Sequence, residues 1–127
     1  MLQGIHHISL KAAGEEQFQR VLDFYTGVLG AGLVRQWGRG DDRGAMLELG
    51  NTLLEVMANG SAGDSKGPFA HIAFRTDDVD AAVRAVEEAG CPVFLLPSDK
   101  NLGGDYPIRI AFCTGPAGED IEFFQER

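Results

Sequence analysis

The 127-residue chain is poor in basic residues and cysteine and has no long apolar run, and each scarcity excludes a class of protein. Eleven Lys and Arg stand against nineteen Asp and Glu, which gives a formal net charge of -8. Binding to a nucleic-acid backbone needs clustered cations that displace counterions, so no nucleic-acid partner is expected. No segment approaches the roughly 18 apolar residues of a membrane span, and the N-terminus lacks a secretion signal. We therefore expect a cytoplasmic protein without membrane association.

The two cysteines, Cys91 and Cys113, are isolated and form no Cys-x-x-Cys motif. Isolated cysteines usually behave as small apolar residues, so neither a zinc motif nor a redox pair is expected. A chain of 127 residues is long enough to bury a core, either as one domain or as two small modules that share one.

An internal repeat organises the sequence. Residues 5–11 align without a gap with residues 69–75, so that apolar, histidine, isoleucine, small, apolar and basic positions coincide. Residues 53–57 likewise resemble residues 120–124, because each segment follows a glycine turn and holds a glutamate among apolar residues. Repetition of this kind indicates one structural unit used twice.

Each half of the repeat carries one histidine and one glutamate. His7 precedes Glu55 by 48 residues, and His71 precedes Glu122 by 51. Successive side chains of a strand point to opposite faces, so these residues lie opposite their apolar neighbours. An ionised Glu in an apolar strand is costly unless it is paired or binds a metal. Two imidazoles and two carboxylates together form a suitable site for a divalent first-row metal.

The periodicity predicts a strand, a helix and three more strands in each half. The first helix, 15–29, has apolar residues at three-and-four spacing and ends at Gly30. The second helix begins with Thr76 or Asp77 as its N-cap and stops at Gly90. The predicted strands are 4–11, 32–37, 45–49 and 51–57 in the first half, and 69–75, 92–96, 108–113 and 121–125 in the second.

We expect a single domain, 1–127, in which a polar, glycine-rich linker, 59–67, joins modules 4–58 and 68–126. Residues 97–107 are expected to form a long loop, which is either an ordinary connection or a segment that closes over a substrate. Strand parity places His6 on the helix-facing side, so we interpret it as structural. Trp37 and Tyr106 are candidates for an apolar wall that the sequence alone does not place.

Five motifs cover nearly the whole chain. They are Gly4-Ile5-His6-His7-Ile8, Asp23-Phe24-Tyr25-x-x-Val28-Leu29-Gly30, Leu54-Glu55-Val56, His71-Ile72-Ala73, and Gly115-Pro116-Ala117-Gly118 through Ile121-Glu122-Phe123. Together they resemble the vicinal oxygen chelate superfamily, which includes glyoxalase I, extradiol dioxygenases, fosfomycin resistance proteins and bleomycin-binding proteins. The resemblance implies an α+β fold in which two βαβββ modules form a cupped half-barrel mixed sheet. It also implies four metal ligands, which are His7, Glu55, His71 and Glu122.

The complete His-Glu-His-Glu set is similar to that of bacterial glyoxalase I, a lactoylglutathione lyase. This branch implies a homodimer and a nickel or cobalt ion, with zinc, manganese or iron as other options. It also implies a small-molecule substrate, such as the glutathione hemithioacetal of methylglyoxal. Asn59 stands where the branch has a glutathione-contacting asparagine, and Lys11 stands where it has an arginine. With Lys100 of the 97–107 loop, these are the candidate substrate-binding residues.

The reaction implied by this branch removes a proton from carbon next to a carbonyl, while the metal stabilises the enediolate. Glu122 is the expected general base, and Glu55 is the ligand or second acid/base. One alternative is a metal-dependent dioxygenase or thiol transferase that uses only His7, His71 and Glu122. The other alternative is a non-catalytic small-molecule binder.

Overall fold

The structure, a computed structural model, describes residues 3, 5–61, 71–102 and 104–127. The chain forms two compact units, Met1–Ser65 (unit 1) and Lys66–Arg127 (unit 2). Most of the predicted linker, residues 62–67, lies outside the described residues, as do residues 69–70 of the predicted strand 69–75. The division into modules 4–58 and 68–126 stays a prediction.

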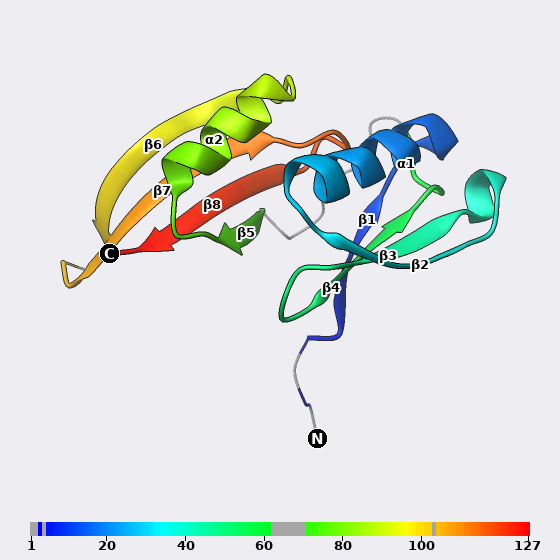
Figure 1. The fold of residues 1–127 in the computed structure, drawn as a ribbon, viewed down its shortest axis with the longest axis horizontal. Helices are drawn as coiled ribbons and strands as arrows, with labels where there is room; N and C mark the ends of the chain where they lie inside the picture. The colour runs from blue at the N-terminus through cyan, green and yellow to red at the C-terminus, as the bar shows by residue number, and fades with distance from the viewer. Residues whose placement is uncertain (1–2, 4, 62–70, 103) are drawn as a thin grey trace. The chain divides into compact units, whose positions relative to one another are not determined.

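Unit 1 is a four-stranded mixed sheet with a helix on one face (Figure 1). Its strands follow the order β1-β4-β3-β2, in which β1 and β4 are parallel and the other neighbours are antiparallel. The elements are β1 (His7–Lys11), α1 (Gly14–Asp23), the π-helical η1 (Phe24–Val28), β2 (Gly32–Trp37), the 3-10 turn η2 (Gly40–Asp42), β3 (Gly44–Glu48) and β4 (Leu53–Met57).

Unit 2 repeats the same topology. Its strands follow the order β5-β8-β7-β6, with β5 parallel to β8. The elements are β5 (Ile72–Arg75), α2 (Val79–Glu88), β6 (Val93–Leu102), β7 (Tyr106–Thr114) and β8 (Asp120–Glu126). The predicted α+β fold of two βαβββ modules is therefore confirmed. The expected half-barrel concerns how the two sheets are placed, and it stays a prediction.

The first helix forms as its apolar spacing predicts. Phe18 and Val21 are fully buried against the sheet, and Leu22 is 5% exposed. The predicted helix 15–29 corresponds to α1 followed by one wider turn, η1, in which the Leu29 N–H donates to the Phe24 carbonyl at 3.2 Å. Gly30 ends the helix with a φ of +76°, a conformation that glycine adopts without strain.

The second helix begins one residue later than predicted. Asp78 is its N-cap, and the Asp78 carboxylate accepts a hydrogen bond from the Ala81 N–H at 2.9 Å. The prediction of Thr76 or Asp77 is wrong, because the Thr76 hydroxyl instead accepts from the Asp78 N–H at 3.1 Å. Such a turn just before the cap satisfies a backbone donor outside the helix.

The prediction of a loop at 97–107 is wrong, because most of these residues belong to strands β6 and β7; whether the segment closes over a substrate stays a prediction. β6 and β7 form one long hairpin in which Lys100 pairs with Ile108. Pro97 does not break β6, because it lies at a register shift between Leu95 and Ser98 on the edge strand of the sheet. Gly103 lies outside the described residues.

Both cysteines are free, and Cys113 belongs to the core of unit 2. Burial raises the pKa of the Cys113 thiol to about 12. Burial also raises the pKa of Cys91, which is partly exposed. A protonated, buried thiol is a poor nucleophile, which fits a packing role for Cys113. No helix among the described residues is long and apolar enough to cross a membrane.

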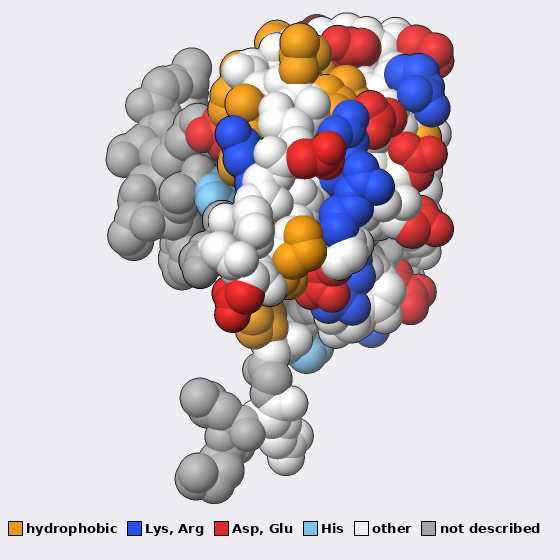
Figure 2. Space-filling view, turned by 90° about the vertical axis from the view of Figure 1, so that its left-hand side faces the viewer, with side chains coloured by type: hydrophobic (Ala, Val, Ile, Leu, Met, Phe, Trp, Pro, Cys, Tyr) orange, Lys and Arg blue, Asp and Glu red, His pale blue; other side chains and the backbone are white. Residues whose placement is uncertain are grey.

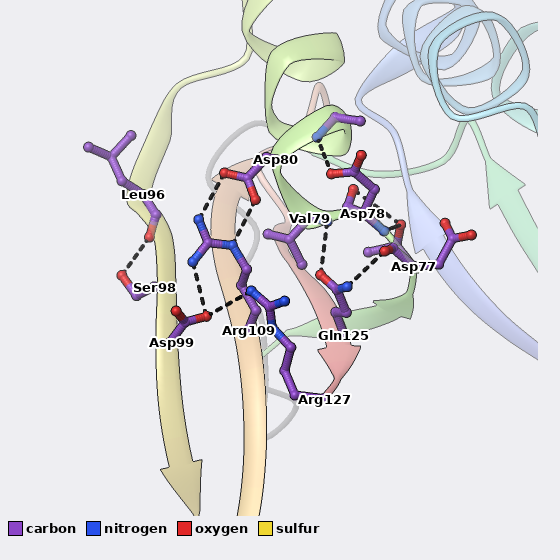
Figure 3. Close-up of polar contacts among 12 residues, drawn as sticks. Asp77, Asp78, Val79, Asp80, Leu96, Ser98, Asp99, Arg109, Gln125 and Arg127 are labelled. Atoms are coloured by element: carbon purple, nitrogen blue, oxygen red, sulfur yellow. Dashed lines mark hydrogen bonds and ion pairs between the residues drawn. The ribbon is translucent and has the colours of Figure 1, made fainter.

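An ionic network links α2 to β6 and β7 (Figure 3). The Arg109 guanidinium donates to both Asp80 oxygens at 2.7 and 2.9 Å, and to Asp99 at 3.0 Å. Arg127 donates to the same Asp99 oxygen at 3.2 Å. On the face of unit 2 that carries β6, acidic and basic side chains lie next to one another (Figure 2). Asp80 of α2 is therefore paired with Arg109 of β7.

We expect replacement of Arg109 by methionine to lower the free energy of unfolding in a pH-dependent way. Hydrogen bonding to Arg109 holds the pKa of Asp80 and Asp99 below the ordinary value of about 3.9. A depressed carboxyl pKa stabilises the folded state above the unfolded pKa, and this stabilisation is lost as the pH falls through the folded pKa.

Urea unfolding between pH 7 and pH 3 at constant ionic strength measures this effect. The difference in free energy of unfolding between wild type and Arg109→Met is expected to be largest at pH 7 and to decrease below about pH 4. Arg20→Met is the matched control, because Arg20 forms only an exposed pair with Glu16, and such pairs contribute about 0.5 kcal/mol or less. A difference that is independent of pH would show that Arg109 acts through packing alone.

Candidate metal and substrate site

The two parallel strand pairs present the predicted residues in the same way. In unit 1, Ser9 of β1 is opposite Glu55 of β4, and in unit 2, Ala73 of β5 is opposite Glu122 of β8. Each histidine lies two residues before the β1 or β5 member of its pair. Alternation places His7, Glu55 and Glu122 on the sheet face opposite to the buried apolar side chains. His71 directly precedes β5, and its contact with Glu122 places it on the same face. We call this the open face of each unit.

In the His7–Glu55 pair of unit 1, a neighbouring hydroxyl binds the carboxylate. The His7 Nε2 lies 3.9 Å from the Glu55 Oε1, and their side chains are 37% and 20% exposed. The Ser9 hydroxyl donates to the same Glu55 oxygen at 3.0 Å. This hydrogen bond fixes the orientation of a carboxylate that has no Lys or Arg partner among the described ion pairs.

The pair of unit 2 is closer and more buried. The His71 Nε2 lies 3.0 Å from the Glu122 Oε2, and the Glu122 side chain is only 10% exposed. Phe112 of β7 is opposite Glu122 in register, and its ring meets His71 edge-on with the centroids 5.2 Å apart. The aromatic contact limits the rotation of the imidazole, so its Nε2 stays directed at the carboxylate.

His6 does not face the helix as predicted. It precedes β1, is exposed, and its Nδ1 lies 2.9 Å from the Nδ1 of His7. Its carbonyl accepts a hydrogen bond from the Leu53 N–H at 3.2 Å. The parity argument failed because the strand begins at His7, so alternation does not extend to residue 6. One of the two Nδ1 atoms carries the shared proton, which fixes the tautomer of the other ring.

The donor atoms of one pair have a separation that is compatible with two ligands of one ion and equally with a direct hydrogen bond. Ligands at about 2.1 Å from an ion and at right angles to each other are about 3.0 Å apart. The His71 Nε2 and the Glu122 Oε2 have this separation, 3.0 Å, and the 3.9 Å of the His7–Glu55 pair is wider. Among the described residues, no three or more His, Cys, Asp or Glu side chains lie close enough together to hold a metal ion.

The three predicted substrate-binding residues fall in both units. Lys11 and Asn59 share one end of the β1–β4 pair, since Lys11 is opposite Met57 and Ala13 forms a bridge with Asn59. Both side chains are exposed. Lys100 is an exposed residue of β6 in unit 2. Their role in substrate binding stays a prediction.

Phe112 is the neighbour of the site that sequence reasoning missed. Its position depends on the register of β7 against β8, where it is opposite Glu122. In the repeat, Met46 holds the position that corresponds to Phe112, because it is opposite Glu55 as Phe112 is opposite Glu122. The register follows from turn geometry and packing, so the two residues did not stand out in the sequence.

We expect Ser9→Ala to weaken metal binding without removing it. Loss of the hydroxyl frees the Glu55 carboxylate to rotate, and partners of this kind contribute about 10- to 100-fold to metal affinity. Calorimetric titration with nickel measures the change. Ser98→Ala is the control, because the Ser98 hydroxyl donates only to the Leu96 carbonyl in β6. An unchanged affinity in Ser9→Ala would show that Glu55 does not depend on this bond.

Comparison with known proteins places the chain in a family. The family model described as the Glyoxalase/Bleomycin resistance protein/Dioxygenase superfamily matches residues 4–123. The chain belongs to this superfamily. The match covers both units and all four residues of the two His–Glu pairs. No curated protein matches the chain.

Solved structures of low sequence identity share the fold of this superfamily member. TnmS3, an antibiotic binding protein from Streptomyces sp. CB03234, has a TM-score of 0.75 and 23% identity, with 99% of this chain and 98% of that chain covered. A lactoylglutathione lyase from Agrobacterium tumefaciens has a TM-score of 0.67 and 19% identity, with coverage of 98% and 94%. A glyoxalase family protein from Enterococcus faecalis has a TM-score of 0.71 and 21% identity, with coverage of 96% and 97%. The fold therefore accommodates both binding and catalysis.

Proposed function

We propose that the chain is a metal-dependent lyase or isomerase of the glyoxalase I type. The single observation that carries this proposal is the repeated His–Glu pair on the open face of each sheet. Within each unit the pair supplies one imidazole nitrogen and one carboxylate oxygen, and two such pairs would complete a four-ligand centre for one ion. Nickel or cobalt is the proposed ion.

The burial of Glu122 supports an ionic role for its carboxylate. Glu122 is the one charged residue in the buried set of the described chain, and its Oε2 is partnered only by His71 in the described ion pairs. A carboxylate away from water is costly unless a cation or several donors compensate it. A bound divalent cation would compensate the Glu122 carboxylate in addition to the His71 ring beside it, which supports the proposal.

A bound divalent ion would supply Lewis-acid stabilisation of the negative charge that develops when a proton leaves carbon next to a carbonyl. The chain's own residues do the rest. Glu122 accepts the substrate proton as general base and gives the same proton back to the neighbouring carbon, while Glu55, held by Ser9, is a ligand or relays that proton as second acid/base. His7 and His71 would hold the ion through their imidazole nitrogens, and Phe112 restricts the His71 ring.

The proposed substrate is a small molecule with two adjacent oxygens, such as the glutathione hemithioacetal of methylglyoxal. Lys11 and Asn59, at one end of the β1–β4 pair, are the proposed contacts for its polar groups, and Lys100 is proposed as a further contact. The proposal includes a homodimer, in which the two His–Glu pairs of one centre come either from one chain or from two.

Isomerisation of the hemithioacetal tests the proposal. Protein loaded with nickel or cobalt is expected to form the thioester product, and chelator-treated protein is expected to lose that rate and regain it when the ion is restored. Oxygen uptake with iron and a catechol would instead favour the dioxygenase alternative. Tight binding of a small molecule without turnover under any metal would favour the non-catalytic binder.

A further inference from the structure

Trp37 lies on the open face of unit 1, on the same side as Glu55. It ends β2 and is directly opposite Gly44 of β3, which is itself opposite Met57 of β4. Residues directly opposite in a sheet point to the same face, and Met57 shares that face with Glu55 two residues earlier. The indole therefore lies on the side of the sheet that α1 does not cover.

Gly44 provides the space for the indole. A Cβ atom at this position would overlap the six-membered ring and the Nε1 of Trp37, so the ring lies across the backbone of β3. Gly44 has no positive φ, so its backbone does not require glycine. A strand glycine without such a requirement marks a place where another group approaches the backbone closely, and here that group is the indole.

Two methionines share this face with Trp37 and Glu55. Met57 is next to Gly44, and Met46 is next to Glu55. We call Trp37, Met46 and Met57 the Trp37 platform; all three are half-buried. None of the three belongs to the buried core of unit 1, whereas Ala45 and Leu47 on the opposite face of β3 are fully buried. Aromatic and thioether side chains on a partly open surface adapt well to flat apolar ligands.

Cations flank the platform. Lys11 is opposite Met57 and Arg35 is opposite Met46, so both belong to the same face. Both side chains are exposed, and none of the ion pairs among the described residues involves either of them. In a chain of net charge -8, an apolar surface with a cation on each side is complementary to a small anion that carries an apolar group.

We propose that Trp37 is a specificity-determining residue that receives an aromatic substituent on the carbon next to the two substrate oxygens. This inference rests on the proposed function, because the metal centre proposed there sets the position of the two oxygens. It extends that function by naming the substrate class. The class is 2-oxo or 2-hydroxy compounds with an anionic group and an aromatic side group, rather than compounds with only a methyl group. A purely structural role, in which the indole merely covers a strand glycine, is the competing explanation.

Mandelate and lactate are matched probes, because they share the 2-hydroxy acid and differ only in a phenyl or a methyl group. Calorimetry on metal-free and zinc-loaded protein gives their dissociation constants. The chain has a single tryptophan, so its emission reports on this position alone. We expect mandelate to bind about tenfold more tightly than lactate and to change the emission, since contacts between aromatic rings contribute about 0.5–1.5 kcal/mol beyond area burial.

Four variants separate specificity from folding. Trp37→Leu is expected to bring the two dissociation constants within about twofold, whereas Trp37→Phe retains most of the preference. Gly44→Ala keeps the indole but displaces it, so the preference falls although the tryptophan remains. Leu33→Ala is the control, because Leu33 is an exposed residue of the same strand that is opposite Leu47 on the other face.

Equal affinity of the wild type for the two probes, or no binding of either, would overturn the inference. So would a preference that survives Trp37→Leu while only the free energy of unfolding falls, which is the result of a merely structural role. Failure of the proposed function would be detected independently, by metal titration and by measurement of hemithioacetal turnover. If the protein prefers mandelate but binds no metal, the proposed metal-dependent reaction is rejected, whereas the proposed role of the Trp37 platform is kept.

Discussion

Replacing Glu122 by glutamine is expected to lower kcat for hemithioacetal isomerisation by about 10²- to 10⁴-fold, the range that a positioned general base contributes. Glutamine has the same shape and keeps a carbonyl oxygen beside the His71 Nε2, 3.0 Å away in the wild type. It cannot accept the substrate proton. Nickel affinity should therefore fall much less than turnover does, which separates the base role from the ligand role.

Glu126→Gln is the matched control for this variant. Glu126 belongs to the same strand and, four residues on, to the same face, but it accepts a hydrogen bond from the Tyr106 hydroxyl at 2.6 Å instead of meeting a histidine. We expect it to keep kcat within about twofold. Steady-state kinetics with nickel-loaded proteins measure both variants. If Glu122→Gln kept most of its rate, another group would have to accept the proton.

Glu55→Ala is expected to weaken nickel binding by at least about 100-fold. Outer-shell partners already contribute about 10- to 100-fold to metal affinity, so a carboxylate bound directly to the ion should contribute no less. The Ser9 hydroxyl would also lose its acceptor, because it donates to Glu55 at 3.0 Å. The measurement is a calorimetric titration of chelator-treated protein.

Glu48→Ala removes the same charge from the neighbouring strand β3, where Glu48 is exposed and pairs with Leu53. It should leave nickel affinity within about twofold, which excludes a general effect of net charge. Retention of metal affinity in Glu55→Ala would favour the dioxygenase or thiol transferase alternative, in which Glu55 is not a ligand.

The sequence predicted the fold well because the repeat supplied the same information twice. The strand Gly32–Trp37 was predicted with its exact bounds, and the His and Glu positions recur in the same order in each half. The boundary between α1 and η1 was not predictable, because a π-helical turn has nearly the same apolar spacing as an α-helix.

The sequence was misleading where a residue's usual preference gave way to its tertiary position. Pro97 suggested a loop, but an edge strand with a register shift tolerates a missing N–H. His6 was assigned to a face by extending alternation one residue beyond the end of β1. Trp37 was a candidate for an apolar wall whose position the sequence did not give. The pairing of Trp37 with Gly44 showed where its ring lies. Register depends on packing between strands, and no local pattern specifies it.

The central claim is that both His–Glu pairs serve one ion, and the stoichiometry of metal binding tests it most directly. Chelator-treated protein is titrated in a calorimeter with nickel, cobalt, zinc, manganese and ferrous ions in turn. The account predicts one tightly bound nickel or cobalt ion per chain, whether the two pairs of a centre come from one chain or from two. Two equivalent ions per chain, or no specific binding, would contradict it.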